Sequence, residues 1–377
     1  MSERPTPMSG SYDPHDCQFL LTPLEPHYTS IQEKERLIQS GRRHYSEMIS
    51  FEQVPSSQYR ELFFQLTALH KERLAQEILA VAEHVMKTRP APYTIASLAR
   101  AGTPFGALLQ RALTQHYGVK SSHYSISIIR DRGIDTRALE YILYDLNRPA
   151  DGLFFVDAWT AKGVITRELK RAIAQWNATH NQRSVISDEL LVISDIGGSA
   201  DYAATYDDYA IPSGVLNATV SGLLSRSILN ESILEGQFHG TVYYEHLREH
   251  DLSRWFLDEV SDLFSQVSPA LPPKESRAER AALTHKWITR WMEDYQITDI
   301  NYIKPGIAEA TRVLLRRVPE RLLIRDPELP DVQHMLVLAQ EKGIPVEIER
   351  SMPFRAAALI KAVSTSERTS AERGGAS

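Results

Sequence analysis

The pattern of apolar and polar positions predicts a helical region ahead of any strand. Apolar residues recur at helical spacing over residues 57–87, which predicts one long helix. Before it, Ser30 and Glu33 have the spacing of a capping box and predict a shorter helix that ends near Gly41. The first thirty residues are rich in Pro, Ser and Gly. We therefore expect them to form a poorly ordered arm.

Four short apolar runs predict buried strands. They cover residues 93–96, 125–129, 153–156 and 190–193, and helical patterns such as residues 105–117 fill the gaps. This alternation predicts βαβ units, and hence an α/β fold with a parallel sheet and flanking helices. Ligands of such sheets bind beyond the carboxyl ends of the strands, so we expect functional residues just after each run.

A smaller unit of the same kind follows a Pro-rich stretch at residues 268–274. Its pattern predicts a helix after Pro305, a strand at 321–325, a helix at 329–342 and a strand at 344–348. Pro305 suits a first helical turn and Gly343 a helix end. The chain then divides into an N-terminal arm and helical lead-in (1–90), an α/β domain (91–265), a linker and helix (266–299), a small α/β domain (300–363) and a disordered tail (364–377).

Composition excludes several classes of protein. The 377 residues carry a formal net charge of −6, which argues against binding nucleic acid or an anionic membrane over the whole surface. No apolar run approaches the roughly 20 residues of a membrane span, and the N-terminus has no signal-peptide pattern. We therefore expect a cytoplasmic protein. Cys17 is the only cysteine, so an intrachain disulfide and a cysteine-rich zinc site are excluded.

The first two predicted strands end in segments that suit an anion. After the first strand come two glycines, a hydroxyl and an arginine ahead of a helix, which would make a compact phosphate-binding loop. After the second come two arginines beside a glycine, which suit a phosphate clamp. An ordinary strand-to-helix turn and a solvated turn explain the same residues. The candidates for substrate binding here are Arg100, Gly102, Thr103, Arg130 and Asp131.

The third strand is followed by the most specific segment. It delivers Asp157 to the sheet edge, and Thr160, Lys162, Gly163 and Thr166 then lead into a helix. A ribose 5-phosphate needs such parts, namely a carboxylate for the vicinal hydroxyls and amides with hydroxyls for the phosphate. The Walker A and dinucleotide-binding glycine spacings are both absent.

This segment resembles the phosphoribosyl diphosphate (PRPP) motif of type I phosphoribosyltransferases, and residues 99–104 resemble their pyrophosphate loop. The resemblance implies their fold, a PRPP substrate with Mg²⁺, and catalytic roles for Asp157 and Lys162. Asp195, after the fourth strand, would assist Mg²⁺ through water, although a helix cap explains it equally well. The sequence departs from the motif in two places, because Ala158 replaces the second acid and Thr166 lies one position late.

Further stretches resemble the phosphoribosyltransferase-like proteins encoded with tellurium-resistance genes. They are residues 10–14, 40–47, 212–222 and 238–240. Some proteins of this family carry the label "cysteine protease StiP". The chemistry here gives that label little support, because Cys17 is flanked by acids in an arm that we expect to be flexible, where nothing would lower the pKa of its thiol.

The C-terminal unit resembles PELOTA-type RNA-binding domains at a helix start. Gly306 would allow close backbone approach, and Lys304 and Arg312 would meet phosphates. Between residues 304 and 325, six basic and two acidic side chains give a local charge of +4. A small α/β domain with a solvated basic helix face is the alternative. The candidate RNA-binding residues are Lys304, Gly306, Glu309, Thr311 and Arg312.

Together these features predict a transferase that binds PRPP with Mg²⁺ and joins the phosphoribosyl group to a base-like acceptor, with RNA bound by the C-terminal domain. The alternative is a non-catalytic, RNA-binding regulator that senses a nucleotide, which Ala158 favours. A cysteine protease is the least favoured reading. Proteins with the implied fold often form homodimers, but the sequence shows no interface pattern.

Overall fold

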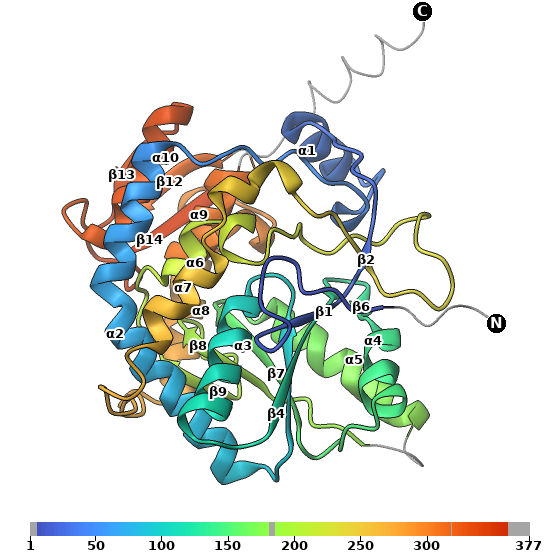
Figure 1. Ribbon diagram of the computed structural model, residues 1–377. Coiled ribbons are helices and arrows are strands. Elements are labelled where there is room, and N and C mark those ends of the chain that lie inside the picture. Colours follow the sequence, from blue (N-terminus) through green and yellow to red (C-terminus); the bar gives the residue numbers. More distant parts are fainter. Residues whose placement is uncertain (1–5, 181–184, 318, 361–377) are drawn as a thin grey trace, which may run out of the picture. The chain divides into compact units, whose positions relative to one another are not determined.

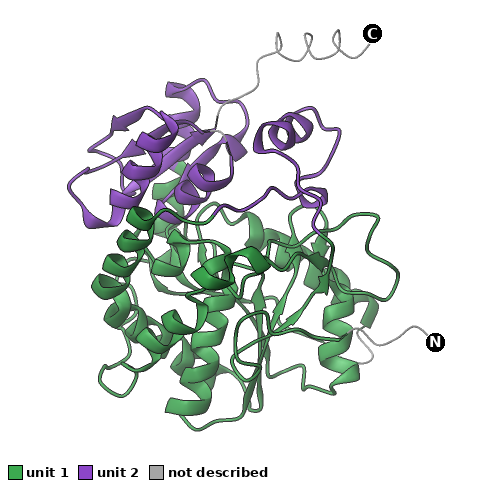
Figure 2. Cartoon of the chain, turned by 45° about the horizontal axis from the view of Figure 1, so that its top comes forward, with its two compact units in different colours: residues 1–25, 54–285 green, residues 26–53, 286–377 purple. Residues whose placement is uncertain are grey.

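The computed structural model describes residues 6–180, 185–317 and 319–360. These residues form two compact units, each of them discontinuous in sequence (Figure 2). Of the described residues, those between 6 and 25 and between 54 and 285 belong to unit 1, and those between 26 and 53 and between 286 and 360 belong to unit 2. The stretch predicted as one lead-in, residues 1–90, thus contributes to both units. The predicted tail at 364–377 lies outside the described residues.

Unit 1 contains a six-stranded sheet among the residues described, and every neighbouring pair of its strands is parallel (Figure 1). In spatial order the strands are β1 (Gln18–Leu20), β4 (Ser121–Ile126), β3 (Tyr93–Leu98), β7 (Leu153–Thr160), β8 (Leu190–Asp195) and β9 (Tyr202–Thr205). The predicted parallel sheet with flanking helices is confirmed. Strand β7 continues four residues beyond its apolar run, so Asp157 lies within the strand.

Helices cover both faces of this sheet (Figure 1). One face packs against α4 (Thr136–Glu140) and α5 (Val164–His180), where Leu139 and Ile173 meet alternate strand residues such as Phe155 and Val192. On the other lie α2 (Ser57–Thr88) and α3 (Gly102–Arg111), which contact each other and strands of the sheet. The predicted long helix is therefore confirmed as α2.

The N-terminal arm is packed, and the prediction of poor order is wrong for residues 6–25. Its strand β1 pairs with β4 at the sheet edge, and Asp16 accepts two hydrogen bonds from the buried Arg111 guanidinium, at 2.7 and 2.8 Å. The Tyr12 hydroxyl donates to the Val220 carbonyl at 2.9 Å. Composition misled the prediction because the consecutive apolar residues 19–21 of this stretch are buried.

The remaining elements of unit 1 are short. A hairpin joins β5 (Ile128–Ile129) to β6 (Gly133–Ile134), and β2 (Thr22–Pro23) pairs with β10 (Gly240–Thr241). The other helices are α6 (Pro212–Val215), α7 (Ser253–Ser261) and α8 (Arg277–Asp294), and the boundary between the two units falls within α8. No helix among the described residues is both long enough and apolar enough to cross a membrane.

Unit 2 is a small α/β region, as predicted. Its sheet order is β11 (Ile303–Pro305), β14 (Ala356–Ile360), β12 (Pro319–Ile324) and β13 (Val346–Ile348), with helices α9 (Ile307–Arg316) and α10 (Gln333–Lys342). Gly343 ends α10 in the left-handed conformation, which confirms that prediction. The placement of Pro305 in a first helical turn is wrong, because Pro305 pairs with Ala357 as the last residue of β11.

A second segment completes unit 2. Helix α1 (Ile31–Gln39) begins where predicted, with the Ser30 hydroxyl accepting the Glu33 amide at 3.2 Å. On the same helix, the buried Glu35 carboxylate accepts two hydrogen bonds from Arg317, which follows α9. Residues 26–53 are thereby tied to the helix for which RNA contacts were predicted.

Lowering the pH should destabilise unit 1 through the buried His123. Its ring bonds the Asp16 carbonyl and the Ser97 hydroxyl, both at 2.7 Å, and burial lowers the pKa of His123 to about 4. An unfolded histidine binds a proton near pH 6.5, so stability falls as the pH drops from 6.5 towards 4, by up to about 3 kcal/mol.

Urea unfolding at pH 7 and pH 4.5 checks this prediction. His123→Gln should show a shallower loss of stability than the wild type, whereas His15→Gln, at an exposed position, should keep the wild-type slope. An H123Q profile as steep as that of the wild type would contradict it.

Candidate functional site

The order of the strands defines where a ligand can bind in unit 1. Strand β4 lies on one side of β3, whereas β7, β8 and β9 follow on the other side. The winding therefore reverses between β3 and β7. In doubly wound sheets a crevice opens at this switch point, beyond the carboxyl ends of the two strands. The segments after β3 and β7 are those for which the sequence predicted ligand contacts.

The structure brings the segment after β3 into contact with β7 itself. Helix α3 begins at Gly102, where a Cβ atom would lie 2.7 Å from the Val156 carbonyl oxygen and 3.1 Å from the Asp157 Cα. Only glycine fits this approach. The half-buried Asp157 carboxylate, which accepts its neighbour's amide at 2.8 Å, thus lies beside the positive end of α3.

Arg100 and Thr103 hold the loop after β3 in place. The peptide bond before Arg100 is cis. The Arg100 guanidinium is buried and donates to the Leu224 carbonyl at 2.7 Å. The Thr103 hydroxyl is buried too and lies 2.7 Å from that of Ser125 on β4. The structure therefore places both side chains inside the protein, where they support the loop that was predicted to bind pyrophosphate.

The segment after β7 turns sharply into α5. Gly163 has a φ of +66°, and its carbonyl accepts the amide of Arg167 at 3.0 Å. The amides ahead of Arg167 therefore have no partner within the helix, and helix starts with such amides can bind anions. The Thr166 hydroxyl is buried there and has no hydrogen-bond partner among the described residues.

Lys162 and Thr160 flank this turn differently. Lys162 is half-buried, and its carbonyl accepts a hydrogen bond from the Arg167 guanidinium at 2.9 Å. The Thr160 hydroxyl lies 3.1 Å from the hydroxyl of Ser199, in the loop after β8. That loop was not predicted to support the turn. The adjacent glycines 197 and 198 are the sequence feature that could have indicated a close backbone contact there.

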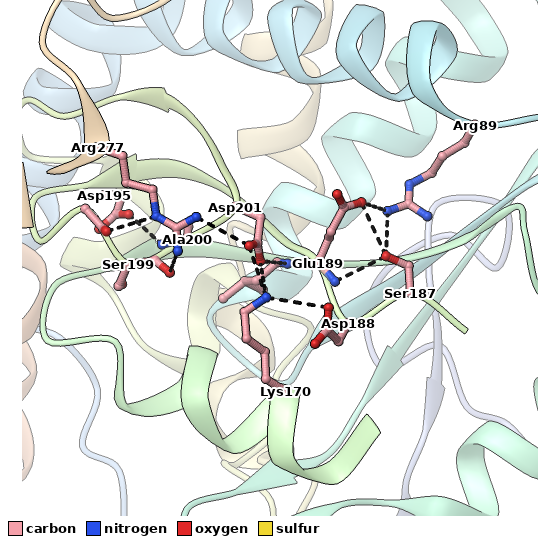
Figure 3. Close-up of polar contacts among 12 residues, drawn as sticks. Arg89, Lys170, Ser187, Asp188, Glu189, Asp195, Ser199, Ala200, Asp201 and Arg277 are labelled. Atoms are coloured by element: carbon pink, nitrogen blue, oxygen red, sulfur yellow. Dashed lines mark hydrogen bonds and ion pairs between the residues drawn. The ribbon is translucent and has the colours of Figure 1, made fainter. Parts of the chain in front are cut away.

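Asp195 anchors the loop after β8 (Figure 3). Its carboxylate is fully buried and accepts the amides of Gly197 at 3.0 Å and Ala200 at 2.6 Å. Burial raises the pKa of Asp195, and the backbone amides, including that of Ser199, oppose this. The carboxylate is enclosed by main-chain donors, so it does not fit the predicted role beside Mg²⁺. The described residues contain no cluster of three or more side chains that could bind a metal.

The predicted arginine clamp forms the tip of the β5–β6 hairpin. Asp131 is left-handed, with φ at +65°, and its amide donates to Glu168 Oε2 at 2.9 Å. Arg130 contacts the Asp131 carboxylate at 3.1 Å. Because Glu168 lies on α5 two residues after Thr166, the hairpin tip is tethered beside the start of α5. No motif in the sequence indicated this role for Glu168.

The predicted RNA-binding residues of unit 2 fall into two groups. Gly306 caps α9 with φ at +84°, Lys304 lies 3.9 Å from Glu309, and Arg312 is half-buried. Thr311 instead is fully buried and lies 2.7 Å from Nε2 of the buried His334. Thr311 therefore supports the helix from inside the unit and does not lie on its surface.

Glutamates outside the basic segment reduce its charge. Arg317 pairs with Glu35 of α1, and Arg321 pairs with Glu347 of β13 at 3.0 Å. Two of the six basic side chains counted between residues 304 and 325 are thus partly neutralised. The charge that a partner of α9 would meet is smaller than the sequence count of +4 suggests.

Comparison with known proteins places the chain in a class. Residues 10–261 match a family described as "Tellurite-like stress resistance cysteine protease StiP", and residues 282–362 match the PELOTA RNA binding domain. A protein of Acinetobacter baylyi named "Cysteine protease StiP" is 39% identical over 371 residues, 94% of each chain. The chain therefore belongs to the StiP family and carries a C-terminal PELOTA domain.

Solved structures offer a more distant likeness. Hypoxanthine phosphoribosyltransferase of Trypanosoma cruzi aligns at 18% identity and a TM-score of 0.27, over 36% of this chain and 77% of that one. The same enzyme in complex with the product IMP aligns at 16% identity and a TM-score of 0.26, over 49% and 93%. TM-scores this low carry no argument, so the description of the fold depends on the strand order and pairing alone.

Removing the Asp195 carboxylate should destabilise unit 1 whether or not Mg²⁺ is present. In Asp195→Ala the loop amides lose their acceptor, at a cost of about 1–3 kcal/mol for each buried group left unpaired. Thermal unfolding with and without Mg²⁺ checks this, with Asp151→Ala, at an exposed position, as the control. If Mg²⁺ stabilises the wild type and D195A abolishes that effect, Asp195 assists the metal after all.

Proposed function

We propose that unit 1 binds PRPP at the β3–β7 switch point and transfers its phosphoribosyl group to a base-like acceptor. The observation that supports this most is the contact between Gly102 and the backbone at Asp157. It brings the start of α3 and a carboxylate of β7 together just beyond the end of β3. The second helix start, after Gly163, adds a site for the 5-phosphate.

Each part then has a role in the transfer. Asp157 accepts hydrogen bonds from the ribose hydroxyls and stabilises the positive charge that develops on the ring. The start of α5 binds the 5-phosphate with Thr166, and Lys162 offsets phosphate charge. Arg130, at the hairpin tip, is the clamp for the diphosphate. The acceptor nitrogen bonds to the anomeric carbon as the bond to pyrophosphate breaks. Pyrophosphate leaves with the electron pair, and the acceptor's proton passes to water.

Magnesium in this proposal belongs mainly to the substrate. Mg²⁺ keeps several water ligands and binds readily to phosphate oxygens. The enclosed Asp195 does not fit as its ligand. The ion would therefore enter with the diphosphate and neutralise the leaving group, while the chain holds the ribose and the 5-phosphate.

A second candidate function is supported by Ala158. This residue is buried and replaces the second acid of the PRPP motif, so the ribose has one carboxylate fewer to bind. A site that retains its phosphate contacts but holds the ribose less firmly suits a sensor of nucleotides. The sensor and the transferase differ in turnover, since only the transferase releases pyrophosphate.

The protease activity in the relative's name finds no support at Cys17. The thiol is fully buried beside β4, and burial, followed by the charge of Asp16, raises the pKa of Cys17 well above its usual value. A protease nucleophile must be accessible and partly ionised. We therefore place this function last. The reason differs from the one drawn from sequence, because the arm around Cys17 is packed and not flexible.

For unit 2 we propose binding to RNA through the start of α9. Gly306 leaves the backbone open to close approach, and Lys304 and Arg312 supply charge for phosphates. Glu309, paired with Lys304, would fix the direction of that lysine. Thr311 would hold α9 in place from inside the unit, through its hydrogen bond to His334.

Binding of PRPP should depend on the Asp157 carboxylate. Asp157→Asn keeps the size of the side chain and removes its charge, so we expect binding with Mg²⁺ to weaken about tenfold or more by calorimetry. Asp151→Asn, in the exposed turn before β7, is the matched control and should bind as the wild type does.

Calorimetry and an assay of pyrophosphate release can each contradict the proposal. If the wild type binds neither PRPP nor any other nucleotide, both readings of this site are wrong. If PRPP binds but a library of bases elicits no pyrophosphate release, the sensor stands and the transferase does not.

RNA binding should depend on Arg312. In Arg312→Ala the loss of one phosphate contact should weaken binding and lower the slope of log affinity against log salt by about one. Fluorescence anisotropy with a hairpin and a single-stranded RNA measures both quantities. Arg350→Ala removes the same charge from an exposed turn after β13 and is the control. Equal losses in the two variants would indicate diffuse attraction and not a site at α9.

A further inference from the structure

Helix α8 lies where the sequence predicted a linker and helix, yet its first half, residues 277–285, belongs to unit 1. Arg277 and Arg280 fall between the two matched segments, residues 10–261 and 282–362. We propose that the first half of α8 positions the phosphate-binding turn at residues 160–166, through the loop after β8. This inference rests on the proposed function of that turn.

The first step is the contact between α8 and the loop. The Ile196 carbonyl accepts the Thr284 hydroxyl at 2.6 Å and Arg280 Nε at 3.0 Å. The Gly198 and Ser199 carbonyls accept Arg277 Nε and Nη2 at 3.1 and 3.0 Å. Thr284 and Arg280 are both buried. Three carbonyls of one short loop are thus bonded to a single helix.

Asp195 holds the opposite side of the same loop, because its carboxylate accepts hydrogen bonds from the loop amides (Figure 3). Gly198 has φ at +62°, and a Cβ atom there would lie 2.3 Å from the Arg277 carbonyl oxygen. The loop is therefore pressed against the helix. With its carbonyls bonded to α8 and its amides to Asp195, it has little freedom to adopt another conformation.

The second step is the contact between this loop and the phosphate-binding turn. A Cβ atom on Gly197 would lie 1.4 Å from the Ala161 carbonyl oxygen, and one on Gly163 would lie 2.7 Å from the Ser199 Cβ. The Ile196 amide donates to the Thr160 carbonyl at 3.2 Å. Ile196 thus bonds α8 through its carbonyl and the turn through its amide. A shift of the loop must move the turn.

A separate link reaches α5 itself. The Asp201 carboxylate contacts Arg277 at 3.5 Å and Lys170 of α5 at 2.9 Å, and it also accepts the Leu190 amide at 3.0 Å (Figure 3). The helix whose start would bind the 5-phosphate is therefore braced by the residue that α8 contacts. Both links lead to the 5-phosphate end of the site. Neither contact involves the start of α3, which follows the segment that resembles a pyrophosphate loop.

Calorimetry on the full-length protein with two partial ligands tests this asymmetry. Ribose 5-phosphate probes the turn, and pyrophosphate with Mg²⁺ probes the start of α3. Thr284→Val removes one hydroxyl at nearly constant volume, and we expect it to weaken ribose 5-phosphate binding about five- to tenfold. Pyrophosphate affinity should stay at the wild-type value. Thr284→Ser keeps the hydroxyl and should restore ribose 5-phosphate binding.

Thr67→Val is the matched control, because Thr67 is an equally buried threonine whose hydroxyl bonds within its own helix, to the Phe63 carbonyl at 2.8 Å. It should leave both affinities unchanged. Unaltered ribose 5-phosphate binding in T284V would overturn the inference and leave the proposed function intact. Equal losses for both ligands would also overturn it, since they indicate general destabilisation. A wild type that binds neither ligand overturns the proposed function and the inference with it.

Discussion

Close contact between main-chain segments is the constraint on which this structure depends. Parallel strands lie about 4.8 Å apart, so the segments that follow neighbouring strands meet as soon as they leave the sheet. At Gly102 a side chain would strike the backbone of β7, and at Gly197 it would strike the turn after β7. Backbone groups cannot rotate away as side chains do. The glycines therefore fix how the segments after β3, β7 and β8 lie relative to each other, and this arrangement is the candidate site.

Buried charges in unit 1 act mainly to hold loops and the arm in place. The Asp195 carboxylate accepts hydrogen bonds from main-chain amides, and Arg280 donates one to a main-chain carbonyl. Arg111 binds the arm through its hydrogen bonds to Asp16. A buried charge without partners is costly, so each of these side chains specifies the backbone that satisfies it. Polar residues near a predicted site are thus poor guides to ligand contacts when they are buried. Thr103 and Thr311, both chosen from sequence as contact residues, are likewise buried, and their hydroxyls bond side chains inside the protein.

The sequence was sufficient to predict the strands and helices whose apolar pattern matches their burial. The runs at β3, β7 and β8 are apolar because both faces of the sheet are covered, and the regular pattern of α2 reflects one long contact with the domain. It was insufficient where the structure depends on partners distant in sequence. Strand β14 (Ala356–Ile360) is mostly alanine, and it pairs with β11 on one side and β12 on the other. The arm is ordered by pairing with β4, and Glu168 and Arg277 matter only because of the loops they meet. No local pattern identifies such residues.

The replacement of an acid by Ala158 can be understood from the strand that carries it. Side chains alternate along β7, so Asp157 and Ala158 project to opposite faces, and Ala158 is packed in the interior. A carboxylate at position 158 would need its own donors on that face. With alanine there, the chain keeps a single acid beside the start of α3, and the proposed function then relies on the two helix starts for most of its anion contacts. If the site binds PRPP as proposed, its affinity should then depend more on phosphate groups than on the ribose, and hence on the loops that position the start of α5.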